Sequence, residues 1–173
     1  MANETPKSPM LGLRLPTDPR WAELVESNIQ EVLTDHAWCE QKAASNAITI
    51  IVHNPDKTEL VEAMTAIAQE ELEHFGQVVD RIKERGWALG PERKDDYVRE
   101  LAKFMKGGNS RTHQLVDRLL FAAMIEARSC ERFRVLSERV SDPELASFYR
   151  DLMISEAGHY TTFLGFARKY ATE

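Results

Sequence analysis

Apolar residues recur at spacings of three and four along four long stretches of the chain, and this pattern is typical of amphipathic helices. The stretches predict long helices over residues 18–52, 56–86, 110–140 and 143–170, with a shorter helix over 91–106. No stretch shows the alternation of a strand hairpin. The sequence therefore predicts an all-α protein in which four long helices pack as a bundle, with a short extra helix between the second and the third.

Local signals place the ends of these helices. Asp18 precedes a proline, which favours a helix start, and Asp56 with Glu59 forms a capping box. Ser110 can cap the third long helix, and Asp142 before a proline restarts the chain into the fourth. A glycine pair at 107–108 should end the short helix.

Each apolar stripe is interrupted near the middle of its helix by a glutamate. These residues are Glu40, Glu71, Glu126 and Glu156, and the second and fourth helices add His74 and His159 at the same face. A carboxylate in an apolar interior costs several kcal/mol unless a cation or hydrogen bonds compensate it. Four such residues at one level of a bundle call for a common explanation.

A pair of metal ions provides that explanation. A Glu-x-x-His turn places both side chains near one ion, because residues three apart lie about 4.5 Å apart along the helix axis. One Glu from each of two helices and one Glu-x-x-His from each of the other two form the di-metal carboxylate arrangement. Each ion would take one His and one terminal Glu, and two further Glu would bridge. The spacing leaves open which glutamates bridge. Mixed carboxylate and imidazole ligands suit iron or manganese, and iron is expected for oxygen chemistry.

The strength of this interpretation lies in a repeat. A chain of this composition contains about 0.5 Glu-x-x-His turns by chance, so the turns alone are weak evidence. Glu40 precedes Glu71 by 31 residues, however, and Glu126 precedes Glu156 by 30. The two halves of the chain thus carry the same ligand set on the same kind of helix pair.

Length and composition agree with a single intracellular domain. A chain of 173 residues can bury a core without disulfides, and its two cysteines, Cys39 and Cys130, are too far apart to form a Cys-x-x-Cys metal site. We expect an N-terminal tail over 1–15 and one ferritin-like di-iron domain over 16–173. The longest apolar run is far shorter than a membrane span needs, which predicts a cytoplasmic protein.

The formal charge of −6 argues against indiscriminate binding to nucleic acid. The charge is uneven, however, because Arg81 to Arg118 holds ten Lys or Arg and six acidic residues. This segment is either an ordinary solvated helix surface or a positive patch for a polyanion.

Other polar residues are not expected in the site. Glu70 and Glu73 flank a proposed ligand but point to other faces, so we expect both in solvent. Glu131 should pair with a nearby arginine. Three histidines lack a partner at ligand spacing: His36, His53 and His113.

Four stretches of the chain resemble one known family. They are Asp35 to Ser45, Glu70 to Phe75, Ile125 to Phe133 and Ser155 to Tyr160. These stretches look like the tRNA 2-methylthio-isopentenyladenosine hydroxylases, and the likeness runs from about Leu15 to Tyr170. It implies a monooxygenase that hydroxylates the isopentenyl group of an adenosine beside the anticodon of tRNA, using two Fe ions, O2 and two external electrons. The ligands carried over are the six named above.

The resemblance also implies partners. Electrons would come from an external electron-donor protein or reductase, because the sequence has no flavin motif and no iron–sulfur cysteines. The tRNA would be held by phosphate contacts. Candidate contact residues are Arg93, Lys94, Arg99, Lys103, Lys106, Arg111, Arg128 and Arg132.

Two alternatives remain open from the residues alone. A rubrerythrin-like peroxidase or a ferritin-like ferroxidase would use the same ligands, and a non-catalytic helical bundle would use none of them. The metal content of the purified protein separates the non-catalytic bundle from the hydroxylase and from the other metal-dependent enzymes.

Overall fold

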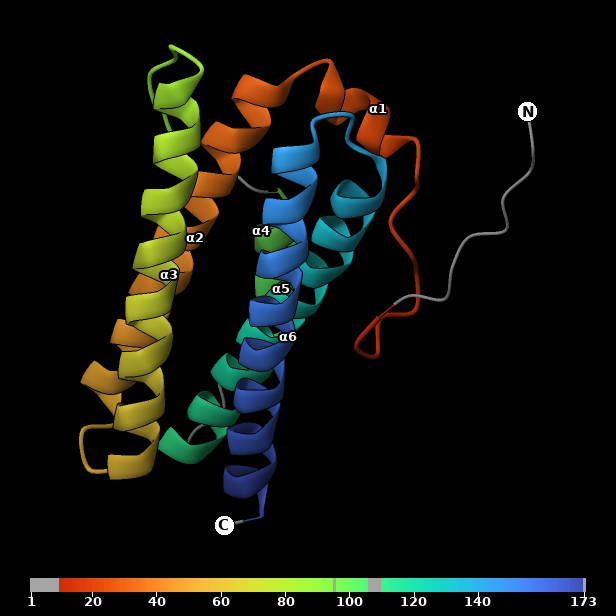
Figure 1. The fold of residues 1–173 in the computed structure, drawn as a ribbon. Helices are drawn as coiled ribbons and strands as arrows, with labels where there is room; N and C mark the ends of the chain where they lie inside the picture. The colour runs from red at the N-terminus through yellow and green to blue at the C-terminus, as the bar shows by residue number, and fades with distance from the viewer. Residues whose placement is uncertain (1–9, 95, 106–109, 173) are drawn as a thin grey trace.

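The computed structural model describes residues 10–94, 96–105 and 110–172, and these residues form helices without strands. Figure 1 shows their arrangement. The helices are α1 (Trp21–Glu26), α2 (Ile29–His53), α3 (Thr58–Glu84), α4 (Asp96–Ala102), α5 (Arg111–Arg139) and α6 (Pro143–Ala171).

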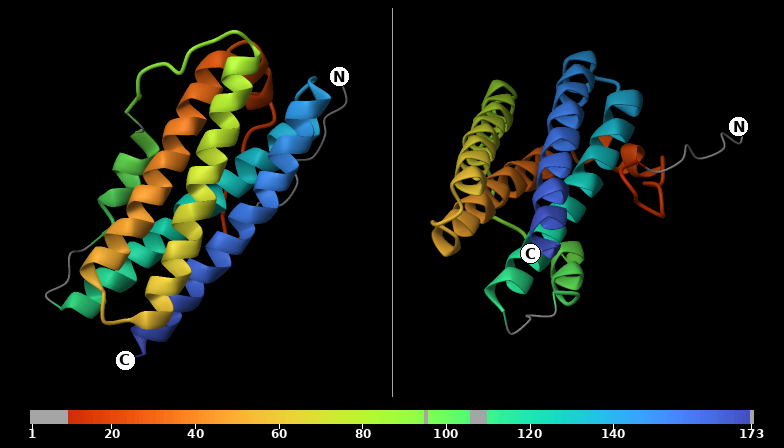
Figure 2. Two further views of the ribbon diagram at one scale, coloured as in Figure 1. Left: turned by 60° about the vertical axis from the view of Figure 1, so that its left-hand side comes forward. Right: turned by 90° about the horizontal axis from the view of Figure 1, so that it is seen from below.

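The four long helices form two antiparallel hairpins, α2 with α3 and α5 with α6 (Figures 1 and 2). Short loops close each hairpin, and the connection from α3 to α5 runs along the bundle and contains α4. One long crossover between two hairpins is the connectivity of ferritin-like bundles. The predicted fold, including the short extra helix between the second and third long helices, is confirmed.

Two of the predicted helix starts have the expected caps. The Ser110 hydroxyl accepts a hydrogen bond from the His113 backbone N–H at 3.1 Å. The Asp142 carboxylate accepts from the backbone N–H groups of Glu144 and Leu145. The capping box predicted at Asp56 is wrong, because α3 begins one residue later than that box requires.

The first predicted helix is divided in the structure. α1 ends at Glu26 and α2 begins at Ile29, so the continuous helix predicted over 18–52 is wrong. The Asn28 side chain donates to the Leu24 carbonyl at 2.8 Å, and the Ser27 hydroxyl donates to the Glu23 carbonyl. Such local side-chain bonds compete with helix continuation, and they end α1 here.

The short helix is also shorter than the predicted range 91–106. Residues 91–94 are not helical, and α4 covers only Asp96–Ala102. Tertiary contacts hold the preceding segment against α2: the Trp38 indole donates to the Gly90 carbonyl at 2.9 Å, and Glu92 pairs with Lys42. These contacts come from residues far away in sequence, and the helical pattern does not contain them.

The described part of the N-terminal tail lies on the second hairpin. Leu13 is buried, and the backbone N–H groups of Met10 and Thr17 donate to the Glu131 carboxylate. Glu131 also pairs with Arg134 at 2.7 Å, which confirms its predicted arginine partner. Residues 1–9 of the predicted tail, residues 95 and 106 of the predicted short helix, and the glycine pair at 107–108 predicted to end that helix lie outside the described residues.

The apolar core has two parts, one toward each end of the bundle. The cluster around Ile50, Leu119 and Phe163 fills one end, and the cluster around Leu33 and Leu136 fills the other. The four glutamates predicted from the pattern occupy the level between the two clusters. In the described part of the chain, no helix combines the length and the hydropathy that crossing a bilayer requires.

We expect Leu119→Ala to lower the free energy of unfolding by about 3–5 kcal/mol, because Leu119 is fully buried and its truncation leaves a cavity. Leu120→Ala is a matched control, since the Leu120 side chain is 41% exposed and should change stability by less than about 1 kcal/mol. Urea unfolding of both metal-free variants measures the difference. Equal losses would contradict this packing.

Candidate metal centre

Six buried side chains from the four long helices converge between the two core clusters. Glu40 comes from α2 and Glu126 from α5, while α3 and α6 each contribute one Glu-x-x-His turn: Glu71 with His74, and Glu156 with His159. All six are nearly inaccessible to solvent. The structure therefore brings together every residue that the interrupted apolar stripes singled out.

The ligand atoms fall into two overlapping groups, and within each group they all lie within 4.8 Å of one another. The first group joins Glu40 and His74 to Glu71 and Glu156. The second joins Glu126 and His159 to the same two glutamates. Glu71 and Glu156 therefore belong to both groups, whereas Glu40 and Glu126 each belong to one.

The polar atoms at this level fit a metal centre. Both carboxylate oxygens of Glu71, one of Glu156, and the Nδ1 atoms of His74 and His159 are buried and form no hydrogen bond of normal geometry with another described residue. His159 Nδ1 nevertheless lies 2.9 Å from Glu71 Oε1, and His74 Nδ1 lies 3.7 Å from Glu71 Oε2. Buried polar atoms are almost always paired, so this cluster of unpaired atoms is compatible with a metal centre.

The pKa values of the buried carboxyls and histidines are also compatible with a metal centre. Burial raises the pKa of Glu126 to about 7 against the hydrogen bond from Glu156, and burial together with neighbouring carboxylates raises the pKa of Glu40 and Glu156. Burial would also raise the pKa of Glu71, but both histidines lower it to about 2. Burial lowers the pKa of His159, but Glu71 outweighs this and raises it to about 9. Without a cation, burial therefore favours the protonated form of Glu40, Glu126 and Glu156.

His36 is a member of the site that the sequence analysis missed. Its Nε2 lies 2.5 Å from Glu40 Oε1, and both side chains are buried. The ring packs against Phe133 and Tyr149, and burial lowers its pKa to about 3. The expectation that His36 lacks a partner is wrong, because a spacing of four residues on one helix also brings side chains together.

Glu70 is the second residue that was assigned incorrectly. Its side chain is 48% exposed, yet Glu70 Oε2 lies 3.1 Å from His159 Nε2, and the Ser155 hydroxyl donates to Glu70 Oε1. Glu70 is therefore bound to the outer edge of the site rather than free in solvent. Among the described contacts Glu73 has no such partner, in line with its predicted exposure.

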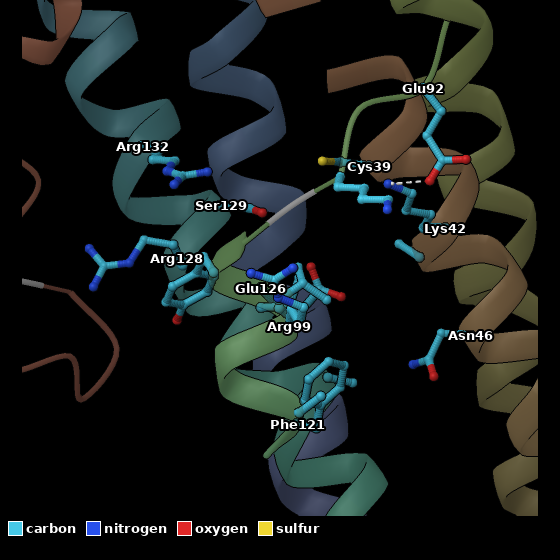
Figure 3. Close-up of a pocket in the computed structure, with 17 residues that line it drawn as sticks. Cys39, Lys42, Asn46, Glu92, Arg99, Phe121, Glu126, Arg128, Ser129 and Arg132 are labelled. Carbon is cyan, nitrogen blue, oxygen red and sulfur yellow. Dashed lines mark ion pairs between the residues drawn. The ribbon is translucent and has the colours of Figure 1, made fainter. Parts of the chain in front are cut away.

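A cavity of about 380 Å³ leads from the surface to Glu126 (Figure 3). α2 and α5 form its walls and α4 covers it, and its lining is mainly apolar with small side chains such as Ala43, Ala122 and Ser129. Basic residues also line the cavity: Lys42, Lys94, Arg99, Arg128 and Arg132. A smaller cavity of about 80 Å³ adjoins Glu40, Glu126 and Glu156.

Four of the eight basic residues predicted to contact RNA line the large cavity: Lys94, Arg99, Arg128 and Arg132. Three of the others lie elsewhere. Arg93 pairs with Glu31 at 3.0 Å, and Lys103 pairs with Glu100. Arg111 donates to the His53 carbonyl at the end of α2, and Lys106 lies outside the described residues. The RNA contacts of all eight stay a prediction.

Two antiparallel hairpins joined by one long crossover, with carboxylates and histidines at their centre, define a ferritin-like bundle whose site is compatible with a metal centre. The family follows from sequence comparison. The sequence profile described as "tRNA-(MS[2]IO[6]A)-hydroxylase (MiaE)" matches residues 6–173, and the chain belongs to this family.

Two curated relatives carry the name tRNA 2-(methylsulfanyl)-N(6)-isopentenyladenosine(37) hydroxylase. The protein from Pseudomonas putida is 39% identical over 164 residues, which are 93% of this chain and 77% of the relative. The protein from Salmonella typhimurium is 28% identical over 96% of this chain and 79% of its own length. A solved structure, titled "Protein 43 with aldehyde deformylating oxygenase activity from Synechococcus", matches with a TM-score of 0.87 and 38% identity, over 92% of this chain and 79% of that one.

We expect the metal-free protein to lose stability as the pH rises from about 5 to about 8. The pKa of Glu126 is about 7 in the folded chain against 4.5 for a free side chain, so its stabilising effect is complete below pH 4.5 and lost as the pH passes 7. The loss for this group is on the order of 3 kcal/mol. Melting temperatures of the metal-free protein across this range measure it.

Glu126→Gln cannot ionise and should flatten this part of the profile, whereas the exposed Glu73→Gln should leave it unchanged. A wild-type melting temperature that is constant between pH 5 and 8 would show that these carboxyls do not titrate as described.

Proposed function

We propose that this protein hydroxylates the isopentenyl group of 2-methylthio-isopentenyladenosine beside the anticodon of tRNA, using O2 and two external electrons at a di-iron centre. Family membership and the names of two relatives support the substrate. The observation that carries the proposal is the apolar cavity with basic residues along it that ends at Glu126. In this proposal residues 16–173 form one di-iron domain and the enzyme acts in the cytoplasm.

The overlap of the two ligand groups supports a specific assignment of ligands. Glu71 and Glu156 would be ligands of both ions, because both belong to both groups. Glu40 and His74 would be the other ligands of one ion, and Glu126 and His159 would be the other ligands of the second. Four carboxylates balance the charge of two divalent cations, which removes the repulsion that otherwise forces the buried carboxyls to hold protons.

When bound, the two iron ions would supply the reduction of O2 and the transfer of a hydroxyl group to the substrate carbon. The chain's own residues do the rest. His36 holds the Glu40 carboxylate in one orientation, because His36 Nε2 contacts Glu40 Oε1. Phe133 and Tyr149 pack against the His36 imidazole and keep it in place. The apolar side chains on both sides of the site keep bulk water away from it.

The cavity suits a nucleoside with an apolar tail. Its volume lies in the range of about 300–1,000 Å³ that is usual for small-molecule sites. Small residues next to Glu126, including Ala122 and Ser129, leave room for a branched alkyl group. The smaller cavity beside Glu40 is of a size for O2. Thus the isopentenyl end would enter first and the purine would follow toward the surface.

The basic residues along the cavity place positive charge where the tRNA backbone would lie. Arg128 and Arg132 project from α5 on one side and Arg99 projects from α4 (Figure 3). Phosphate contacts position a nucleic acid without reading its sequence, which suits an enzyme that recognises one modified nucleotide. An external electron donor must supply the electrons, and the proposal includes such a partner.

The decisive experiment incubates the iron-loaded, reduced protein with tRNA bearing 2-methylthio-isopentenyladenosine in air, and then analyses the nucleosides by mass spectrometry. We expect the modified nucleoside to gain one oxygen atom. Glu126→Ala should abolish the gain, and tRNA carrying unmodified adenosine should not react. An unchanged nucleoside mass, while the bound iron is oxidised and reduced again, would rule out this function.

Metal content tests the ligand assignment separately. We expect the wild-type protein to bind about two iron ions per chain, and Glu71→Ala to bind fewer than one, because Glu71 contacts both sites. Glu73→Ala removes a carboxylate two residues away on the exposed face and should keep the wild-type content. Full iron binding by Glu71→Ala, measured on protein whose helical circular dichroism is unchanged, would refute the bridging role.

A second candidate substrate is an aliphatic aldehyde. The solved structure with aldehyde deformylating oxygenase activity is 38% identical to this chain, and the apolar lining of the cavity would accept an alkyl chain. Incubation of the same reduced protein with aldehydes of increasing length, followed by gas chromatography of the products, distinguishes aldehyde deformylation from tRNA hydroxylation. Alkane formation at a rate above that of tRNA hydroxylation would favour this candidate.

A further inference from the structure

The internal repeat aligns Glu70 with Ser155. Glu70 directly precedes Glu71, as Ser155 directly precedes Glu156, and each lies four residues before a histidine of the site. Because the two Glu-x-x-His turns face each other, these two side chains meet between α3 and α6. The Ser155 hydroxyl donates to Glu70 Oε1. One carboxylate and one hydroxyl thus occupy positions that the repeat makes equivalent.

Glu70 lies beside the outer nitrogens of the site's two histidines, within hydrogen-bond distance of His159 and farther from His74. Glu70 Oε2 lies 3.1 Å from His159 Nε2, and Glu70 Oε1 lies 3.9 Å from His74 Nε2. The opposite nitrogens, Nδ1 of both rings, face Glu71 at the centre. Each ring therefore has its inner nitrogen at the ligand cluster and its outer nitrogen toward the same carboxylate.

We propose that Glu70 is a positioning residue shared by both metal-binding histidines, and that Ser155 holds it in place. The inference rests on the proposed metal centre and deepens it. A neutral imidazole carries one N–H, and the partner of that N–H determines which nitrogen remains free to bind a metal. A carboxylate at Nε2 keeps the proton there, so that Nδ1 presents its lone pair to the ion.

The asymmetry of the repeat explains why a serine is present at position 155. A second glutamate there would place two carboxylates side by side at the edge of the site, and like charges at this distance repel. A hydroxyl instead donates a hydrogen bond and fixes the carboxylate of Glu70. One carboxylate can then serve two rings, with the shorter contact to His159 and the longer one to His74.

Metal titration tests this role. We expect Glu70→Ala to weaken metal binding by about 10–100-fold, the usual effect of removing such an outer partner. The ion bound to His159 should lose more affinity than the ion bound to His74, because its contact with Glu70 is shorter. Glu70→Gln keeps an acceptor oxygen and should recover part of the loss. Glu73→Ala is the matched control and should bind metal like the wild type. Co(II) is the probe, followed by its visible absorption.

A second measurement reports on the histidine rings themselves. In the Co(II) protein, the ring N–H protons of metal-bound histidines give strongly shifted proton NMR signals that disappear in D2O. Glu70→Ala should make the His159 N–H signal exchange faster, whereas Glu73→Ala should leave it unchanged. The His74 N–H signal should change less, because His74 lies farther from Glu70, and a general loss of packing would not follow that order.

Exchanging the two positions tests the repeat. The double variant Glu70→Ser with Ser155→Glu moves the carboxylate to the equivalent place on α6, and we expect it to recover most of the affinity that Glu70→Ser alone loses. Failure of this recovery, or Glu70→Ala binding both Co(II) ions as tightly as the wild type with unchanged N–H exchange, would overturn the inference. If Glu70→Ala binds both Co(II) ions as tightly as the wild type, the proposed metal centre is still supported and only the role of Glu70 is refuted. A wild-type protein that binds no Co(II) would overturn both proposals.

Discussion

Four carboxylates buried at one level of a helical bundle are the constraint on which the rest of this structure depends. Each would cost several kcal/mol in an apolar interior without compensation, and the described side chains around them provide only part of it. Within each hairpin the helices pack closely, whereas the two hairpins approach each other more loosely. The space between the hairpins therefore holds the polar cluster and the cavities, while the apolar clusters toward both ends supply the packing.

The internal repeat is complete in the proposed ligands, but the residues around the ligands differ between the two halves. These differences give the two halves different roles. Four residues before Glu40 stands His36, which contacts that carboxylate among aromatic rings. Four residues before Glu126 stands Ala122, which lines the large cavity instead. A bulky side chain at the second position would close the path to Glu126. The first half thus fixes its carboxylate, and the second half leaves its carboxylate accessible.

The four long helices and the six residues at their centre could be predicted because both follow from periodicity within single helices. The errors occur where contacts between distant residues determine the structure. The segment before α4 is not helical because Trp38 and Lys42 on α2 bind it, and neither residue belongs to its local pattern. The break at Asn28 had a local signal, since asparagine and serine side chains bond to the preceding turn, but the apolar spacing continues across it.

The outer contacts of the site were missed for a reason that concerns side-chain reach. One residue along a helix rotates the side chain by about 100° around the axis, so Glu70 falls on a different face from Glu71 in any helical projection. That face borders α6, however, and a glutamate is long enough to reach His159 across the gap between the two helices. Periodicity tells which residues point into the bundle. Which residues at its edge reach inward depends on the distance between neighbouring helices, and that distance is known only once the hairpins are placed side by side.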